Sequence, residues 1–226
     1  MLSLSCGSFS TKAQIRVNAN GTVIFSNSNN KPVVKLPPID IKKVDFKNFA
    51  YPELLTGTAD KNFILTNGQY RSKKSLSQRV YTLRKTYYFD ITGDEKDEAI
   101  TLILAEGCGE GCDSHNLFYV YTVENNQLKL IWQIATGAEA LGGLKSAAFK
   151  NKQIVLELFG NCTIDKSLIS ARFDPKNPKK ILLTDFTRFV FSFKDNVFSY
   201  STKELLPLQV KNITGYNFQI SFGELD

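Results

Sequence analysis

Leu117-Phe-Tyr-Val-Tyr-Thr-Val123, Glu124-Asn-Asn-Gln127 and Leu128-Lys-Leu-Ile-Trp-Gln133 together form the stretch that decides the fold. The two outer arms alternate in side-chain character and are rich in aromatic and β-branched residues, which is typical of strands. The polar segment between them carries an Asn-Asn pair, which is typical of a tight turn. The stretch therefore predicts a β-hairpin.

The same pattern recurs along the chain, and a sustained helical period of apolar residues is absent from its middle. We therefore predict an all-β fold, an antiparallel meander of β-hairpins arranged as a sandwich, a layered sheet or a partial propeller. The other predicted hairpins join 14–17 to 22–25, 63–65 to 69–70, 146–149 to 154–159, 187–193 to 197–200, and 208–210 to 217–222.

Prolines set the expected domain organisation. Residues 26–62 contain four of them and predict an extended connector with one edge strand near Ile39 to Phe46. We expect an N-terminal hairpin and connector over 1–43 and a main β domain over 44–226. Lys203-Glu-Leu-Leu206 predicts a single helical turn that ends at Pro207.

Composition limits the classes of protein to consider. The 226 residues are 42% apolar and include 17 Phe and 9 Tyr, enough for a sizeable core. The net charge of +6 is a moderate excess of lysine without a nucleic-acid-binding motif, so no nucleic-acid partner is expected. The sequence contains no apolar run of eighteen residues, so no transmembrane helix is expected.

An acidic segment, Asp90-Ile-Thr-Gly-Asp-Glu-Lys-Asp-Glu98, runs directly into the apolar strand Ile100–Leu104. Carboxylates at its first, fifth and ninth positions and a hydroxyl at its third could converge on one hard cation. Asp90, Thr92, Asp94 and Glu98 are thus the candidate calcium ligands. Two departures weaken this set, because Thr92 stands where an acid is usual and Glu95 where a glycine usually eases the turn. The alternative is a purely structural turn held by side-chain bonds to backbone amides.

Three of the four cysteines, Cys108, Cys112 and Cys162, lie at the ends of strands or in a glycine-rich loop and are candidate disulfide partners. Together with His115 they could also form a zinc set. The alternative enzymatic hypothesis is a hydrolase using the Cys112/His115 loop, although no third orienting group is evident.

The fourth cysteine, Cys6, follows Met1-Leu-Ser-Leu-Ser5, which lacks the charged and long apolar regions of a complete signal peptide. This segment could be the remainder of a lipoprotein signal, in which case Cys6 is the lipidation candidate. A lipid at Cys6 is the only membrane link that we expect.

Several motifs in one order carry a resemblance to a known family. They include Asp90-Ile-Thr-Gly-Asp94, Cys108-Gly-Glu-Gly-Cys112 and Leu156-Glu-Leu-Phe-Gly-Asn-Cys162. Over roughly residues 44–165 the chain resembles a family of bacterial exported proteins and lipoproteins of unassigned activity, with cyanobacterial and proteobacterial members. The acidic motif alone is also similar to the repeats of integrin-type propellers. The resemblance implies a periplasmic, outer-envelope or secreted location.

These observations predict a non-enzymatic binding or structural module of the bacterial envelope, with one calcium ion at the acidic turn and no other cofactor. The ligand, the protein partner and the oligomeric state do not follow from the sequence.

Overall fold

The computed structural model describes residues 37–55, 61–72, 78–108, 113–138, 142–171 and 185–207, together with the backbone of two short N-terminal strands. In these ranges the chain is built from strands in mostly antiparallel sheets, none of which closes on itself. The predicted all-β class is therefore confirmed. The N-terminal strands, β1 (Gln14–Val17) and β2 (Val23–Ser26), pair with each other as predicted.

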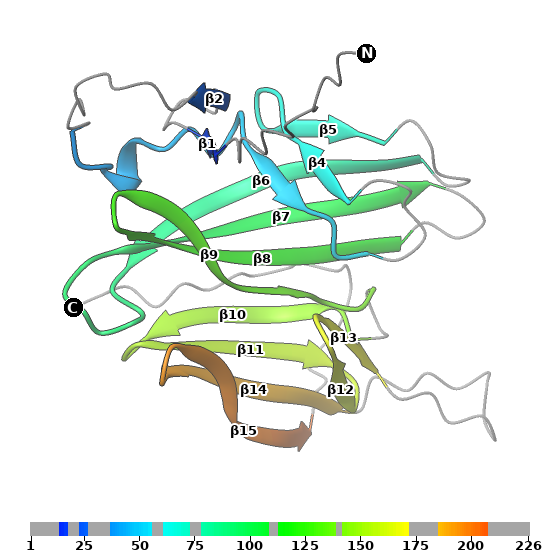
Figure 1. Cartoon of the computed structure of the whole chain (residues 1–226). Coiled ribbons are helices and arrows are strands. Elements are labelled where there is room, and N and C mark those ends of the chain that lie inside the picture. The colour runs from blue at the N-terminus through cyan, green and yellow to red at the C-terminus, as the bar shows by residue number, and fades with distance from the viewer. Residues whose placement is uncertain are drawn as a thin grey trace, which may run out of the picture.

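Two large sheets face each other (Figure 1). The seven-stranded sheet has the order β12-β13-β9-β8-β7-β6-β5, and the four-stranded sheet has the order β10-β11-β14-β15. The strands of the first are β5 (Gln69–Arg71), β6 (Gln78–Phe89), β7 (Glu98–Cys108), β8 (Asp113–Glu124), β9 (Gln127–Ala135), β12 (Cys162–Asp165) and β13 (Leu168–Ala171). The strands of the second are β10 (Leu144–Lys150), β11 (Gln153–Phe159), β14 (Asp185–Lys194) and β15 (Val197–Pro207).

The hairpin that decides the fold is present as β8 and β9, which pair from Leu117↔Ala135 to Glu124↔Gln127. Its turn residues Asn125 and Asn126 both have positive φ, at 51° and 57°. This backbone matches the right-handed twist of the strands, and asparagine adopts it more readily than most residues. The predicted hairpins β10–β11 and β14–β15 form in the same way, around Asn151-Lys152 and Asp195-Asn196.

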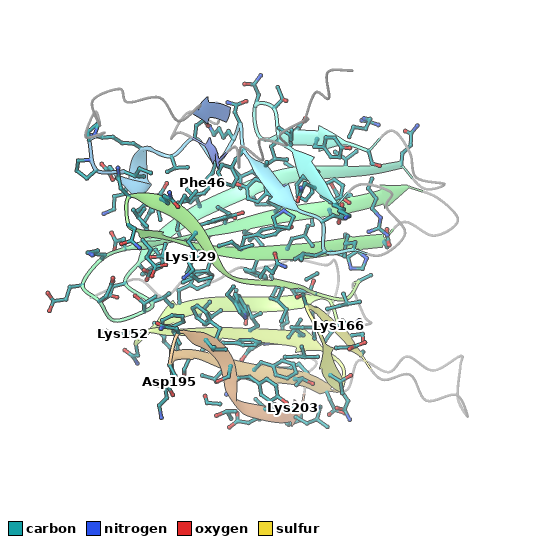
Figure 2. The ribbon with its side chains drawn as sticks, viewed as in Figure 1. Phe46, Lys129, Lys152, Lys166, Asp195 and Lys203 are labelled. Carbon is teal, nitrogen blue, oxygen red and sulfur yellow. The ribbon has the colours of Figure 1, made fainter. Side chains whose placement is uncertain are left out.

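The centre of the seven-stranded sheet is buried on both faces. On β8, Phe118 and Val120 point into a core between the two large sheets, whereas Tyr119 and Tyr121 point into a second core on the opposite face. Successive side chains of a strand point to opposite faces, so a strand buried on both sides is apolar throughout. The side chains that fill both spaces are drawn in Figure 2.

A small N-terminal layer covers the second core. It consists of the 3₁₀ helix η1 (Ile41–Lys43) and the pair β3 (Ala50–Pro52) and β4 (Asn62–Ile64). Buried tyrosines fasten this layer to the sheet, because a phenol in a core needs a hydrogen-bond partner. The Tyr119 hydroxyl donates to the carbonyl of Pro52 at 2.8 Å, and the Tyr81 hydroxyl donates to Glu53 Oε2 at 2.6 Å.

Three local predictions are wrong. The edge strand expected near Ile39 to Phe46 is instead η1, because the Asp40 side chain accepts the amide of Lys42 and caps a helical turn. The helical turn expected at 203–206 is part of β15, where pairing with β14 overrides the local preference. The hairpin expected around Asn67-Gly68 is reduced to one bridge, Thr66↔Gln69, because β4 pairs with β3 and β5 pairs with β6.

Two further predictions lie outside what the structure tests. The hairpin of 208–210 and 217–222 falls outside the described residues. The domain boundary after residue 43 stays a prediction, although Ile41 and Val44, on its two sides, are buried in the same core cluster.

Glu157 on β11 holds three strands together on the exposed face of the four-stranded sheet. Its Oε2 accepts from Lys145 Nζ at 2.6 Å and its Oε1 accepts from Arg188 Nη2 at 2.7 Å. Burial raises the pKa of this carboxyl, but the bonds from Lys145, Arg188 and Ser146 outweigh burial and lower the pKa below the ordinary glutamate value.

Glu157→Gln is therefore expected to lower the free energy of unfolding at neutral pH by about 1–2 kcal/mol. Because the folded-state pKa is depressed, this stabilisation is present above the ordinary pKa and is lost as the pH falls through the folded-state pKa. Urea unfolding at a series of pH values measures the difference between the variant and the parent. Glu124→Gln is the matched control, since the exposed Glu124–Lys129 pair should contribute little. A difference that persists unchanged into acid would contradict this account of Glu157.

Candidate functional site

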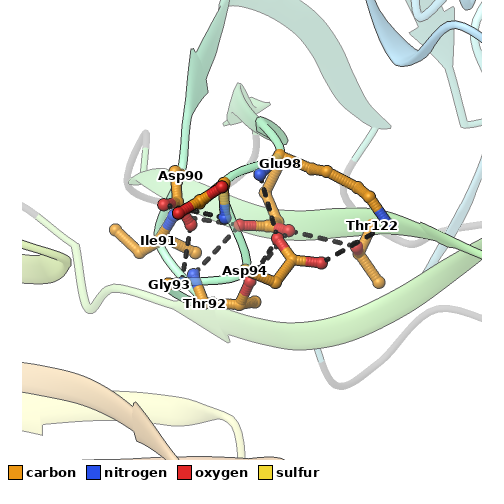
Figure 3. Close-up of polar contacts among 9 residues, drawn as sticks. Asp90, Ile91, Thr92, Gly93, Asp94, Glu98 and Thr122 are labelled. Atoms are coloured by element: carbon orange, nitrogen blue, oxygen red, sulfur yellow. Dashed lines mark hydrogen bonds and ion pairs between the residues drawn. The ribbon is translucent and has the colours of Figure 1, made fainter.

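The acidic turn lies between β6 and β7, and its shape follows from its own side chains (Figure 3). Asp90 Oδ1 accepts the amide of Gly93 at 2.6 Å, and Asp90 Oδ2 accepts the amide of Glu95 at 3.2 Å. Asp94 Oδ1 accepts the amide of Lys96 at 3.1 Å. These bonds curl the chain around the two aspartates, as in other aspartate-rich turns.

Two residues of the turn have positive φ, Gly93 at 87° and Glu95 at 66°. Position 95 is where the sequence lacks the glycine usual in calcium-binding turns, and the structure places a glutamate in this left-handed conformation. The turn therefore forms in spite of the strain that a side chain brings there.

Glu98, at the start of β7, is fully buried and holds the turn in place through hydrogen bonds. Its Oε2 accepts the amides of Ile91 at 2.9 Å and Thr92 at 3.0 Å, and its Oε1 accepts the hydroxyl of Thr122 on β8 at 3.1 Å. Burial raises the pKa of Glu98, while the bonds from the Thr92 and Ile91 amides and the Thr122 hydroxyl oppose that rise.

The three carboxylates converge. Asp90, Asp94 and Glu98 each present one oxygen, and these oxygens lie within 4.8 Å of one another. The Thr92 hydroxyl lies between two of the carboxylates, 3.1 Å from Asp94 Oδ1 and 3.2 Å from Glu98 Oε1. The four residues singled out in the sequence as calcium ligands are thus brought together, and the group could hold a metal ion.

The Thr92 hydroxyl leaves this group incompletely satisfied. A hydroxyl has one hydrogen, so Thr92 can donate to Asp94 or to Glu98 but not to both at once. The nearest cations to the aspartates, Lys152 at 3.6 Å from Asp90 Oδ2 and Lys96 at 4.0 Å from Asp94 Oδ2, are both well exposed. Three carboxylates so close together repel one another, and a bound cation would relieve that repulsion.

The turn also contacts the other layers of the molecule. Asp97, an acid of this segment that is not among the candidate ligands, pairs with Lys42 of η1 at 2.6 Å. Lys152, in the turn between β10 and β11, reaches Asp90 from the four-stranded sheet. These partners and Thr122 were missed in the sequence, because nothing near the acidic turn in the chain indicates which distant residues pack against it.

His115 lies in a separate polar cluster on β8. Its Nδ1 is 2.8 Å from the carbonyl oxygen of Thr136, and its Nε2 is 3.1 Å from Asp113 Oδ2. Arg79 on β6 also donates to Asp113, at 3.0 Å. Gly107 lies beside this pair, and a Cβ added at Gly107 would collide with Asp113 Oδ1.

Both ring nitrogens of His115 are directed at oxygen atoms in this arrangement. A carbonyl only accepts, so Nδ1 must donate to Thr136, while Nε2 faces the carboxylate of Asp113. Cys112 and the side chain of Cys108 lie outside the described residues, so the hydrolase and zinc hypotheses for this loop stay untested.

Cys162 does not form the predicted disulfide, because its thiol is free and buried. The thiol donates to the carbonyl of Phe159 at 3.3 Å, and burial raises its pKa to about 11. Cys162 on β12 packs in the core between the two large sheets, and four strand spacings separate β12 from β7, which carries Cys108. That separation is roughly 19 Å along the sheet, well beyond the ~7 Å between Cα atoms that a disulfide spans.

The lipidation candidate, Cys6, lies outside the described residues. None of the helices in the described part of the chain has the length and apolar character needed to span a membrane. No family model matches this chain, and neither does any curated protein or solved structure. The resemblance to a bacterial exported family therefore stays a prediction.

Proposed function

We propose that this protein is a non-enzymatic β-module of the bacterial envelope that binds one calcium ion at the turn between β6 and β7. The observation that carries the proposal is the convergence of oxygens from Asp90, Asp94 and Glu98 within 4.8 Å. The proposed role of the ion is structural, because the turn contacts all three layers of the molecule.

The chemistry of the donors supports calcium over other metals. The group offers carboxylate oxygens and a hydroxyl without a sulfur or imidazole, and such all-oxygen sets suit hard cations. Calcium tolerates irregular coordination and completes its shell with carbonyls and water, whereas magnesium demands a near-ideal octahedron. When calcium binds, the Thr92 hydroxyl would direct its hydrogen away and offer its oxygen as the fourth side-chain ligand.

The expected affinity is modest. Calcium modules outside the cell have dissociation constants on the order of 10⁻⁴–10⁻³ M, which suits an exported protein. An exported location, with a lipid at Cys6 as the only membrane link, belongs to this proposal and is supported by the family resemblance of residues 44–165.

Calcium is expected to raise the midpoint of thermal unfolding of the metal-free protein in a saturable way. At a calcium concentration about 100 times the dissociation constant, binding should add about 2.7 kcal/mol to the free energy of unfolding. Asp94→Asn should abolish the shift while keeping the fold, since the amide oxygen can still accept from Lys96.

The matched control is Glu95→Gln, which removes a neighbouring charge whose exposed carboxylate is not part of the group. This variant should retain the calcium-dependent shift. An equal shift in Asp94→Asn, or no shift in the parent protein, would refute the proposed site.

A further inference from the structure

Lys152, which is labelled in Figure 2, reaches the acidic turn from the other large sheet. It lies in the two-residue turn between β10 and β11, and its Nζ is 3.6 Å from Asp90 Oδ2. Its side chain also lies against the backbone of Gly93, since a Cβ added at Gly93 would be 3.1 Å from Nζ and 3.3 Å from Cδ of Lys152. An ammonium group therefore lies beside the segment that carries the candidate calcium ligands.

The backbone at Lys152 favours a role for its side chain. Asn151 and Lys152 have φ of 51° and 59°, and turns of this kind usually have glycine or asparagine at the second position. The hairpins β8–β9 and β14–β15 have Asn126 and Asn196 there. A lysine is less favourable than either residue in this left-handed conformation. Its contact with Asp90 helps to offset that conformational cost.

We propose that Lys152 is a tethered counter-ion of the acidic turn, which calcium displaces from Asp90 and which thereby sets the calcium affinity of the site. This inference rests on the proposed function, because it concerns the regulation of the same site. An ammonium group and a divalent cation beside one carboxylate repel each other. Calcium binding therefore weakens the contact between Lys152 and Asp90, and that contact weakens calcium binding by the same factor.

The exchange alters how the two large sheets are linked at this end of the molecule. Without calcium, Lys152 joins the turn between β10 and β11 to Asp90 of the acidic turn. With calcium, this link is released, whereas the bond from Thr122 of β8 to Glu98 remains. Calcium thus strengthens the acidic turn itself and frees the neighbouring β10–β11 turn from it.

Calorimetric titration of calcium into the metal-free full-length chain measures the effect on affinity. Lys152→Met should lower the dissociation constant roughly threefold to tenfold at low ionic strength, because it removes a positive charge close to the bound ion. This difference should shrink in about 1 M salt, where the screening length is only about 3 Å. Lys150→Met is the matched control, since Lys150 is an exposed lysine at the end of β10 in the same hairpin. It should change the affinity by less than about twofold.

Thermal unfolding with and without calcium separates this inference from the calcium site itself. In a chelator, Lys152→Met should lower the unfolding midpoint by roughly 1–3 °C, the contribution of one exposed ion pair in a chain of this size. In saturating calcium the same substitution should not lower the midpoint, because Lys152 then no longer contacts Asp90.

Two results would overturn the displacement of Lys152 while the parent protein keeps its calcium-dependent shift. One is an equal fall of the midpoint in Lys152→Met with and without calcium, and the other is a calcium affinity that Lys152→Met leaves unchanged. A parent protein whose midpoint does not respond to calcium would instead refute the proposed site, and the displacement together with it.

Discussion

Glu98→Ala is expected to lower the free energy of unfolding by about 2–4 kcal/mol. The substitution removes the acceptor of the Ile91 and Thr92 amides, in a place where Glu98 itself is 0% exposed. Buried donors without an acceptor carry their full desolvation cost, and the lost side chain also leaves a cavity under the turn. Chemical denaturation in the absence of calcium measures this effect separately from any metal.

Glu98→Gln is the matched control for that prediction. The glutamine oxygen can still accept the two amides, and its NH₂ group can donate to the hydroxyls of Thr92 and Thr122. We therefore expect Glu98→Gln to lose much less stability than Glu98→Ala. Similar losses in the two variants would show that the charge of Glu98, rather than its hydrogen bonds, stabilises the turn.

Phe118→Ala is expected to cost about 3–5 kcal/mol, the range for truncating a buried phenylalanine. Phe118 lies on the central strand β8, is 0% exposed and points into the core between the two large sheets. A loss of that size is a large share of the stability of an ordinary domain. Urea unfolding followed by tryptophan fluorescence is a suitable measurement, since Trp132 packs against the same core.

Ile64→Ala provides the control, because Ile64 is also an apolar strand residue but is 62% exposed. Its effect should stay within about 0.5 kcal/mol. If Phe118→Ala were equally mild, the two sheets could not be packed on each other through β8 as described.

The sequence predicts those parts of the fold that are determined by residues close together in the chain. The β8–β9, β10–β11 and β14–β15 hairpins each combine alternating arms with turn residues that accept positive φ, such as Asn125 and Asn126. Because a turn of this kind fixes both the pairing and the register, the neighbouring arms follow from it.

Other elements depend on contacts that the sequence does not display. β6 is twelve residues long, but its register shifts between Leu83 and Lys85, so alternation breaks in its middle and the pattern does not stand out. Pairing with other strands likewise sets the secondary structure of residues 203–206 and of the segments on both sides of Asn67-Gly68. In both places it overrides the local sequence preference.

In the candidate site, too, the residues close together in the chain could be predicted and the distant ones could not. Asp90, Thr92, Asp94 and Glu98 could be found because all four lie within nine residues and one turn brings them together. Thr122, Lys42 and Lys152 come from three other elements, and only the packing of the layers places them beside the turn. For Cys162 the sequence suggested a functional role that the structure does not show. This candidate disulfide partner is a free cysteine packed in the core.

Calorimetric titration of calcium into the metal-free full-length chain is the most direct test of the site at the turn between β6 and β7. The account predicts saturable binding of one ion per chain, lost in Asp94→Asn and retained in Glu95→Gln. Absence of binding at millimolar calcium, or undiminished binding in Asp94→Asn, would contradict it.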